Sequence, residues 1–443
     1  MGKMKKILIL GAGRVTRPAV SYLLKKGYEI TLSDISGENL DAISSSCPAA
    51  KTRLFNASEG YGAMMEQENP DLVMCMLPPR FMAPVMSLCA DRGIHLVHPA
   101  YLDDAQRGLS EKIKESGAVM IAELGLDPGI DHMTAAKTIK NAGIRGLRIE
   151  SYRSVCGALP SPEANNNPWG YKLSWAPESL IGASRRSARV LLDGEEHNWP
   201  DGETFEHAYL EDIGDLGCFE VYANADSLPY RNFYGIPDAT TIYRGTLRYP
   251  GWCETISAMN RLGLISADAV SFEGLTFLGF VARVLGVEKN RAREEFLSRL
   301  NLRTNSAIYL RLDWIGFFSD RPIPLSSGTA MDVMGVLFGE KLIFKESERD
   351  IVVLLDEFIL VDEKSGDKIK SSMMLVDYGI PGGDSAIART TGLPPAVASD
   401  MILSGRITSP GLHIPVQEEI YSSVLDELEK LGIEMTDQEI SIA

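Results

Sequence analysis

The chain has 443 residues, of which 45% are hydrophobic and 23% are charged, and its formal net charge is −16. This length and composition are ordinary for a globular protein of two or three domains, and the negative charge argues against nucleic acid or an anionic membrane as a partner. The N-terminal residues run directly into an apolar strand with no signal peptide, and no apolar stretch is long enough to span a bilayer. The six cysteines are scattered without CxxC spacing, which indicates reduced thiols in a cytoplasmic protein and no metal site.

Residues 5–34 have the pattern of a βαβ unit. An apolar run ends at Leu10, the turn Gly-Ala-Gly-Arg-Val-Thr follows, residues 17–26 have helical spacing, and residues 28–32 predict a second strand. Gly11 allows the tight turn, and Gly13 lets the backbone approach a pyrophosphate at the helix N-terminus. Thr16 stands where the fingerprint has its third glycine, so a plain βαβ turn is the alternative. The cofactor-binding residues predicted here are Gly11, Gly13, Arg14, Val15 and Thr16.

Asp34 follows the second predicted strand and bears on the choice of cofactor. A carboxylate at this place accepts hydrogen bonds from the ribose hydroxyls of NAD. A 2′-phosphate would meet that carboxylate at close range, and Arg14 offsets this repulsion only in part. The sequence therefore predicts NAD in preference to NADP.

Further strands and helices alternate up to residue 122. Because ligands lie outside the carboxyl ends of the strands in such sheets, Leu77 and Pro78, which follow a buried strand, should border the cofactor. The six strands predict a Rossmann domain over residues 1–130, on which helix 385–404 packs. The expected strands are 52–57, 71–77, 94–98 and 118–122, and the expected helices are 81–92 and 103–116.

The segment 123–132, ELGLDPGIDH, follows the sixth predicted strand. Two glycines, a proline and several acids at a strand end are typical of a site-lining loop. The plainer interpretation is the N-terminal loop of a helix that runs to Ala142, with Asp131 as its cap. The two interpretations are compatible.

From residue 146 the apolar pattern loosens, and a second domain is expected. The fold class predicted for the whole chain is α/β, with an N-terminal Rossmann domain, a mixed-sheet α/β substrate and dimerisation domain, and an inserted helical region. The mixed-sheet domain should span 131–253 and 346–384, the helical subdomain 254–345, and a C-terminal helical segment 405–443. The long loop 157–175, rich in proline, asparagine and aromatics, is typical of a functional loop.

Several stretches resemble the saccharopine dehydrogenase (glutamate-forming) family, also called saccharopine reductase. The matching stretches are GAGRVTRPA at 11–19, ELGLDPGIDH at 123–132, CGALPSPEANNNPWGYKLSW at 156–175, IYRGTLRYPG at 242–251 and LVDYGIPGG at 375–383. The resemblance implies an oxidoreductase of lysine metabolism that interconverts saccharopine with L-glutamate and 2-aminoadipate 6-semialdehyde, uses NAD or NADP, and is a homodimer.

The resemblance also implies roles for single residues. Asp127 is the candidate for proton transfer, while Tyr101 and Cys156 line and orient the reacting centre. Leu126 and Trp175 would contact the cofactor. A buried apolar thiol, a packing tyrosine and a core tryptophan are the plainer alternatives. The substrate-binding residues implied are Tyr101, Asp127, Arg244, Gly245 and Thr246.

Two departures from the family pattern leave the identity of the substrate and of the cofactor open. Ala225 stands where family members have an arginine that would hold a substrate carboxylate, and Arg17, Arg80 or Arg153 could supply that charge instead. Ser33-Asp34 stands where NADP-using members have an arginine. The alternatives are a dehydrogenase of another N-(carboxyalkyl) amine, such as a carboxylated polyamine or an opine, and a non-enzymatic NAD-binding sensor.

Overall fold

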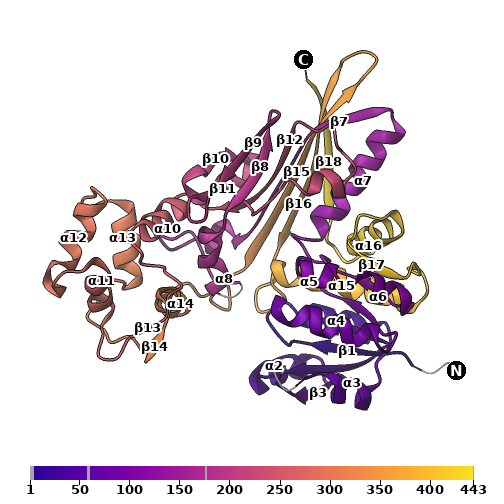
Figure 1. The fold of residues 1–443 in the computed structure, drawn as a ribbon, viewed down its shortest axis with the longest axis horizontal. Coiled ribbons are helices and arrows are strands. Elements are labelled where there is room, and N and C mark those ends of the chain that lie inside the picture. Colours follow the sequence, from indigo (N-terminus) through magenta and orange to yellow (C-terminus); the bar gives the residue numbers. More distant parts are fainter. Residues whose placement is uncertain (1–3, 57–59, 175–176, 443) are drawn as a thin grey trace. The chain divides into compact units, whose positions relative to one another are not determined.

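The computed structural model describes residues 4–56, 60–174 and 177–442. Contacts between Cα atoms divide the chain into two compact units, the first made of residues 1–149 and 354–443 and the second of residues 150–353. Figure 1 labels their elements along the chain. No helix among the described residues is long and apolar enough to cross a membrane.

The first unit contains a parallel sheet built from the N-terminal residues. The strand order among the described residues is β17-β6-β5-β4-β1-β2-β3, in which β1 pairs with both β2 and β4. This confirms the Rossmann prediction and adds a strand, β17, which pairs in parallel with β6. The strands are β1 (Lys6–Leu10), β2 (Glu29–Asp34), β3 (Lys51–Leu54), β4 (Leu72–Cys75), β5 (His95–Val97), β6 (Val119–Ile121) and β17 (Gly411–His413).

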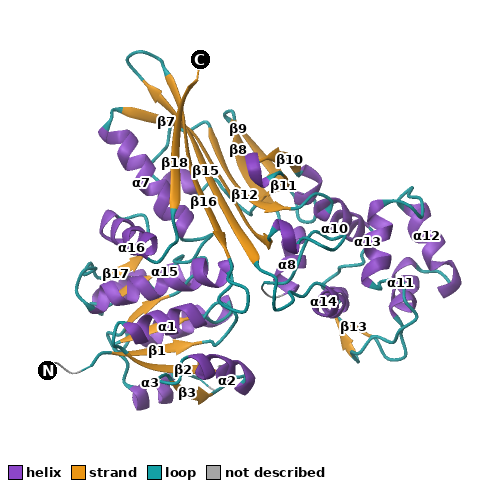
Figure 2. Cartoon of the chain, turned by 180° about the vertical axis from the view of Figure 1, so that it is seen from behind, coloured by secondary structure: helices purple, strands orange, loops and turns teal. Residues whose placement is uncertain are grey.

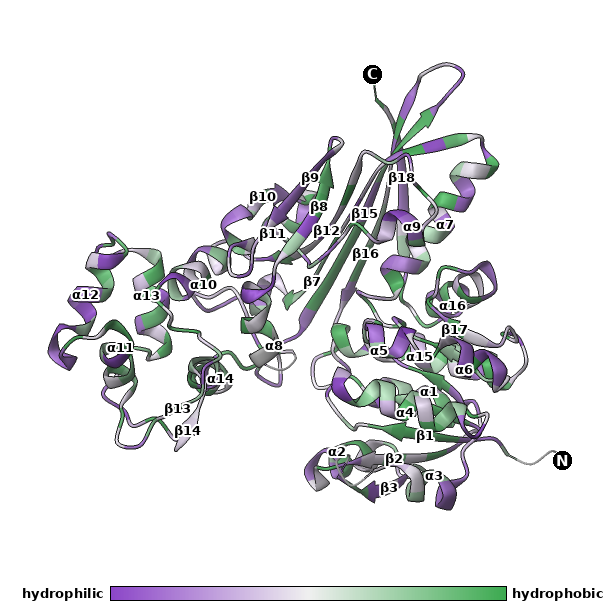
Figure 3. Ribbon diagram, in the orientation of Figure 1, coloured by the Kyte–Doolittle hydropathy of each residue, from purple (hydrophilic) through white to green (hydrophobic). Residues whose placement is uncertain are grey.

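Helices cover this sheet and bury its apolar strands. One core cluster joins Leu8 of β1 and Val73 of β4 to Val85 and Met86 of α4, and Figure 3 shows β1 mostly in green. Strands buried on both faces are continuous apolar runs, as the sequence shows here. The expected helix 103–116 is two short helices separated at Gly108. The helices are α1 (Arg17–Lys25), α2 (Gly37–Ser46), α3 (Gly62–Glu68), α4 (Met82–Ala90), α5 (Asp104–Arg107) and α6 (Ser110–Glu115).

The C-terminal helices belong to the same unit. Helix α15 (Ala386–Leu403) packs against α1, where a Cβ on Gly392 would clash with the carbonyl of Val15. Helix α16 (Glu418–Lys430) packs against α15 and against α7 (Ile130–Ile144). Glycine at 392 therefore permits the close approach of α15 to the glycine-rich turn.

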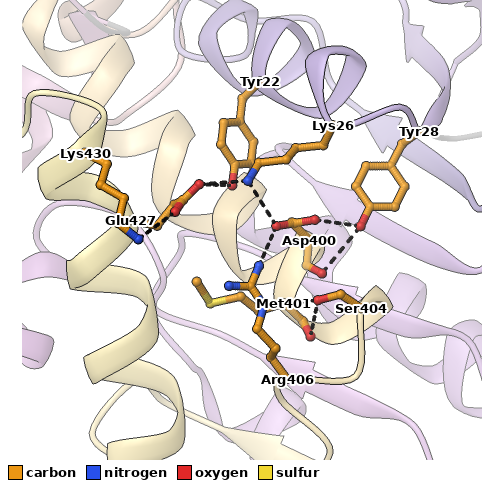
Figure 4. A network of polar contacts seen from close by, with 9 residues as sticks. All are labelled: Tyr22, Lys26, Tyr28, Asp400, Met401, Ser404, Arg406, Glu427 and Lys430. Carbon is orange, nitrogen blue, oxygen red and sulfur yellow. Dashed lines mark hydrogen bonds and ion pairs between the residues drawn. The ribbon is translucent and has the colours of Figure 1, made fainter.

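Polar contacts fix these helices to α1 (Figure 4). Lys26 lies 2.8 Å from Glu427 and 3.6 Å from Asp400, and the hydroxyl of Tyr28 donates to Asp400 at 2.8 Å. Arg406 pairs with Asp400 at 2.7 Å. The hydrogen bond from Lys26 holds the pKa of the Glu427 carboxyl below its usual range. Asp400 is therefore a shared partner of Lys26, Tyr28 and Arg406.

Three further strands belong to the first unit, except for the first residues of β15 (Asp350–Asp362), which belong to the second. The three strands are neighbours in the order β15, β16 (Lys368–Tyr378) and β18 (Met435–Ile442). Residues 368–375 of β16 pair with residues 442–435 of β18. The segment 405–443, predicted as helical, contains helix α16 but also the strands β17 and β18, so the prediction was incomplete. The alternating polar residues of β18 are exposed, so its apolar signal is weak.

The second unit is built on a mixed sheet, seen from behind in Figure 2. Strand β7 pairs in parallel with β12, whereas β12 pairs antiparallel with β11 and β8. Strands β9, β10, β13 and β14 were not expected from the sequence. The strands are β7 (Leu147–Pro160), β8 (Ala188–Leu192), β9 (Glu195–Trp199), β10 (Tyr209–Asp212), β11 (Cys218–Ala223) and β12 (Thr241–Arg248), with the short pair β13 (Val270–Ser271) and β14 (Ser327–Gly328).

Most of the remaining chain of the second unit is helical. The expected helical subdomain, residues 254–345, lies in this unit and contains most of its helices. The helices of the second unit are α8 (Pro177–Gly182), α9 (Tyr230–Phe233), α10 (Trp252–Arg261), α11 (Phe277–Leu285), α12 (Ala292–Arg299), α13 (Ala307–Ile315) and α14 (Ala330–Lys341).

Candidate functional site

The glycine-rich turn lies at the carboxyl end of β1. Gly11 is buried with φ +102°, and a Cβ there would approach the carbonyl oxygen of Met76 to 2.7 Å, so the fold requires glycine. Gly13 is exposed, and a Cβ there would have no heavy atom within 4 Å. Helix α1 has no side-chain cap at Thr16, whose hydroxyl instead donates to the carbonyl of Gly11 at 3.1 Å. Open space at Gly13 beside an uncapped helix N-terminus fits a pyrophosphate.

Asp34 at the end of β2 contacts this turn. Its Oδ2 accepts from the backbone N–H of Ala12 at 2.6 Å, and its Oδ1 accepts from the N–H of Ser36 at 2.7 Å. Each carboxylate oxygen therefore already holds a backbone donor. These bonds partly offset the negative charge and aim the carboxylate at the chain, so Asp34 is not simply an acceptor for ribose.

The other predicted cofactor residues lie at neighbouring strand ends. Leu77 and Pro78 follow β4, where the N–H of Met76 donates to the carbonyl of Leu10 at 2.7 Å, beside the turn. Leu126, in the loop after β6, is buried. Arg14 is exposed within the turn. Trp175 lies outside the described residues.

Tyr101 and Asp127 meet at the same edge of the parallel sheet. Tyr101 follows β5 and Asp127 follows β6, and these strands are adjacent. The Tyr101 hydroxyl donates to Asp127 Oδ1 at 2.6 Å, and Tyr101 is 38% exposed. A short phenol–carboxylate hydrogen bond on an accessible side chain suits the transfer of a proton to a bound molecule.

Backbone hydrogen bonds shape the loop that carries Asp127. Gly125 N–H donates to the carbonyl of Pro128 at 2.8 Å, and Ile130 N–H donates to the carbonyl of Gly125 at 2.9 Å. Helix α7 begins at Ile130 with Gly129 at its N-cap. Asp131 is therefore not the N-cap residue, although its carboxylate accepts from Gly129 N–H at 2.6 Å.

A buried acid–histidine pair, which the sequence did not single out, joins the two ends of this loop. Glu123 Oε2 lies 2.9 Å from Nε2 of His132, and the two residues are 2% and 0% exposed. Glu123 Oε1 accepts from Leu102 N–H at 3.0 Å and lies 3.7 Å from Arg107. An acid and a histidine at the two ends of 123–132 were the only signal in the sequence.

A second histidine is buried nearby, just after β5. His98 is 0% exposed, and neither ring nitrogen has a hydrogen-bond partner within the described part of the chain. Burial lowers the pKa of His98 to about 4, although the negative charge of Glu123 opposes this shift. The imidazole is therefore neutral at physiological pH.

In the second unit, Cys156 and Arg244 share one face of the sheet. Cys156 of β7 pairs with Thr246 of β12, and paired residues of neighbouring strands point to the same side. Arg244, two residues before Thr246, is on that side as well. Cys156 is 6% exposed and Arg244 is 2% exposed, with its guanidinium 4.3 Å from the ring centre of Tyr230. Arg244 is thus not a surface arginine.

The three arginines suggested as replacements for the family arginine at position 225 have other partners or surroundings. Arg17 pairs with Asp384 at 2.7 Å, and Arg80 lies over the ring of Phe81. Arg153 pairs with Glu211 and is on the opposite sheet face from Arg244, because it pairs with Tyr243 in the register. Hydrogen bonds to Glu211 and Tyr209 raise the pKa of Arg153 although burial opposes this.

A further arginine, not considered from the sequence, lies beside the turn at Ala225. The N–H of Arg189 donates to the carbonyl of Ala225 at 3.1 Å. Its guanidinium lies 3.4 Å from Asp226, and about half of its side chain is exposed. Arg189 therefore already provides a cation at this turn.

Family models match almost the whole chain. The saccharopine dehydrogenase NADP binding domain matches residues 7–121, and the saccharopine dehydrogenase C-terminal domain matches residues 125–433. These models correspond to the Rossmann sheet and to the rest of the chain.

Named proteins and a solved structure agree with these matches. The chain is 32% identical over 450 residues to "Saccharopine dehydrogenase [NADP(+), L-glutamate-forming]" of Pyricularia oryzae, covering 99% of both chains. It is 32% identical over 453 residues to the mitochondrial alpha-aminoadipic semialdehyde synthase of Bos taurus, and it spans about half of that protein, 48%. Apo saccharopine dehydrogenase (L-Glu forming) from Saccharomyces cerevisiae superposes with a TM-score of 0.88 at 30% identity, covering 98% of this chain and 100% of the other.

These comparisons correct the prediction of the cofactor. The matching domain model is NADP-binding, and the fungal relatives are named for NADP(+). The prediction of NAD over NADP was therefore wrong. It assumed that Asp34 is free to repel a 2′-phosphate, whereas both of its oxygens bind backbone N–H groups.

Proposed function

Because the chain belongs to the saccharopine dehydrogenase family, we propose that it interconverts saccharopine with L-glutamate and 2-aminoadipate 6-semialdehyde. The proposed cofactor is NADP(H), as in the names of its fungal relatives. This activity would place the enzyme in lysine metabolism.

The observation that carries the proposal is the Tyr101–Asp127 pair at the strand ends that follow the glycine-rich turn in the same sheet. When bound, NADP(H) supplies or accepts a hydride at the carbon next to the substrate nitrogen. The protein must also move protons to and from that nitrogen and from the water that hydrolyses the imine. We assign this proton transfer to Asp127, oriented by Tyr101.

Residues of the first unit provide the proposed place for the cofactor. The pyrophosphate would lie against Gly13 and the N-terminus of α1, where the structure leaves open space. Leu77, Pro78 and Leu126 are the proposed apolar contacts, because they follow β4 and β6 at the same sheet edge.

Residues of the second unit are the proposed contacts for the substrate. Saccharopine carries three carboxylates, and arginine binds carboxylates with strong, charge-assisted hydrogen bonds. Arg244, with Gly245 and Thr246 on the same strand, is the proposed carboxylate-binding stretch. Cys156 is paired with Thr246 and is proposed to line the reacting centre.

Ala225 favours a second candidate function. In this candidate function no residue replaces the family arginine that pairs with a substrate carboxylate. The substrate would then have one carboxylate fewer than saccharopine, such as another N-(carboxyalkyl) amine. Arg189 beside Ala225 supports saccharopine instead, because its guanidinium is held only by an exposed pair with Asp226 at 3.4 Å, and exposed pairs of this kind are weak.

The direct test is turnover of saccharopine with NADP, followed at the nicotinamide absorbance. Saccharopine oxidation with a higher kcat/KM for NADP than for NAD is the expected result. Turnover of a substrate with one carboxylate fewer, in the absence of saccharopine turnover, would support the second candidate. Binding of the cofactor without turnover of any such amine would indicate a sensor.

A homodimer and a cytoplasmic location are also proposed. All six cysteines are free thiols in the structure, which fits a reducing compartment. Sedimentation of the purified chain at twice the monomer mass is the expected result for the dimer.

A further inference from the structure

We propose that Glu123 is a positioning residue that keeps Tyr101 and Asp127 within hydrogen-bonding distance of each other. This inference rests on the proposed function for its kinetic consequences only. In the proposed mechanism Glu123 contacts neither the cofactor nor the substrate, and it acts through its neighbours.

The two carboxylate oxygens of Glu123 bind the two segments that carry the pair. Oε1 accepts from the N–H of Leu102, the residue next to Tyr101, at 3.0 Å. Oε2 lies 2.9 Å from His132, in the first turn of the helix that follows the Asp127 loop. The Glu123 side chain therefore holds both the segment that carries Tyr101 and the helix start that follows Asp127. These two residues form the 2.6 Å hydrogen bond.

The position of Glu123 is energetically expensive. The residue is 2% exposed, and its backbone has φ +54°, a left-handed conformation that non-glycine residues rarely adopt. A buried carboxylate must be matched by donors, and here His132, Leu102 and the nearby Arg107 serve this purpose. An apolar side chain would fill the same volume without this desolvation penalty, so stability alone does not explain a carboxylate here.

Small displacements of this pair should matter for turnover. A misplacement of a catalytic group by about 1 Å can lower the rate by about a hundredfold. Tyr101 lies on a loop, so the position of its hydroxyl depends on how firmly the backbone of that loop is held. The anchored backbone at Leu102 supplies that restraint.

The first test compares three variants of similar volume. Glu123→Met removes both hydrogen bonds without leaving a cavity and should lower kcat at least about tenfold, with the Kd of NADPH unchanged. Glu123→Gln keeps an acceptor for Leu102 and a hydrogen-bonding group for His132, and should restore kcat to within about threefold of wild type. The matched control is Glu68→Met, which removes a carboxylate that binds Thr31 and Arg53 in the same unit, and should leave kcat unchanged.

A double-mutant cycle shows whether Glu123 acts through Tyr101. In a Tyr101→Phe background, Glu123→Met should lower kcat by less than about threefold, because the bond it protects is already absent. Full, additive loss of kcat in that background would contradict the proposal. So would a Glu123→Met variant with wild-type kcat, or one whose only defect is weaker NADPH binding.

Hydrogen exchange of the protein without ligands provides a readout that does not need the substrate. In Glu123→Met the Leu102 amide should exchange at least about tenfold faster, while amides of α4 keep their protection. His132→Leu leaves the Leu102 bond intact, so it should lower kcat with Leu102 still protected, and it serves if Glu123→Met does not fold. Unchanged exchange at Leu102 in Glu123→Met would overturn the proposal. Absence of saccharopine turnover in the wild type would overturn only the proposed function.

Discussion

The hydroxyl of Tyr101 donates a 2.6 Å hydrogen bond to Oδ1 of Asp127. The two residues are 26 positions apart and follow adjacent parallel strands, β5 and β6. Tyr101 and Asp127 therefore lie at the same edge of the sheet because the strands that precede them are neighbours. The bond forms only when those strands pair.

Replacement of Asp127 by asparagine should abolish most of the proposed activity. The amide keeps the shape and still accepts a hydrogen bond from Tyr101, but it cannot take up a proton. We expect kcat for saccharopine to fall by a factor on the order of 100 to 10,000, the usual contribution of a general acid–base group. Tyr101→Phe should cost less, about tenfold, because the carboxylate remains. Steady-state kinetics with NADPH binding as the control measure both effects, and wild-type kcat in Asp127→Asn would remove Asp127 from the mechanism.

Gly13→Val tests the pyrophosphate site. The structure leaves open space at this position, so the variant should fold, while its side chain occupies the volume of the pyrophosphate. We expect NADPH affinity to fall at least about a hundredfold by titration, with an unchanged circular dichroism spectrum. Gly143→Val, at another exposed glycine with open space around it, is the matched control and should bind NADPH normally.

Gly11→Val should instead damage the fold, because its Cβ would meet the Met76 carbonyl. Undiminished binding in a folded Gly13→Val variant would refute the site.

Ala225→Arg tests whether the missing arginine matters. Arg189 already lies at this turn, paired with Asp226, so a second guanidinium should not improve kcat/KM for saccharopine. A gain of about tenfold or more, equivalent to about 1.4 kcal/mol of transition-state binding, would show that the pocket lacks a charge. That result would point to a natural substrate with one carboxylate fewer.

His98 should make the protein sensitive to acid. Burial lowers the pKa of His98 from its ordinary value of 6.5 to about 4. Below pH 6.5 the unfolded chain therefore binds a proton more readily than the folded chain. Stability from this residue is complete above about pH 6.5 and is lost toward pH 4, with a loss of about 2 kcal/mol by about pH 5. His98→Leu should remove this part of the pH dependence. Thermal midpoints of both proteins at neutral pH and near pH 5 measure it, and parallel pH curves would contradict the assignment.

Asp400→Ala tests how the C-terminal helices are held on α1 (Figure 4). The change leaves Tyr28, Lys26 and Arg406 without their shared acceptor, and should cost about 1–3 kcal/mol of stability. Lys430→Ala removes only an exposed partner of Glu427 at 3.4 Å, and should cost less than about 0.5 kcal/mol. Shifts in the thermal midpoint rank the two variants. Equal shifts would mean that the buried carboxylate does not matter more than the surface pair.

The sequence by itself determined the elements that depend on local patterns. The strand, turn and helix over residues 6–25 follow from an apolar run, Gly11 and helical spacing, all within one segment. Most helices and strands were found near their bounds for the same reason, and Tyr101 and Asp127 were named from strand ends. Strand β18 was missed because its exposed residues leave little apolar periodicity to detect.

The tertiary structure decided which side chains meet. Asp34 seemed free to bind ribose until the fold placed the Ala12 and Ser36 N–H groups on its two oxygens. Glu123 gains its partners, Leu102 and His132, only after β5 and β6 pair and the loop to α7 closes. Arg244 and Cys156 share a face because of the register between two strands that lie some 90 residues apart in the chain. Spacing along a chain fixes the local backbone, whereas hydrogen bonds between distant residues depend on how the elements pack.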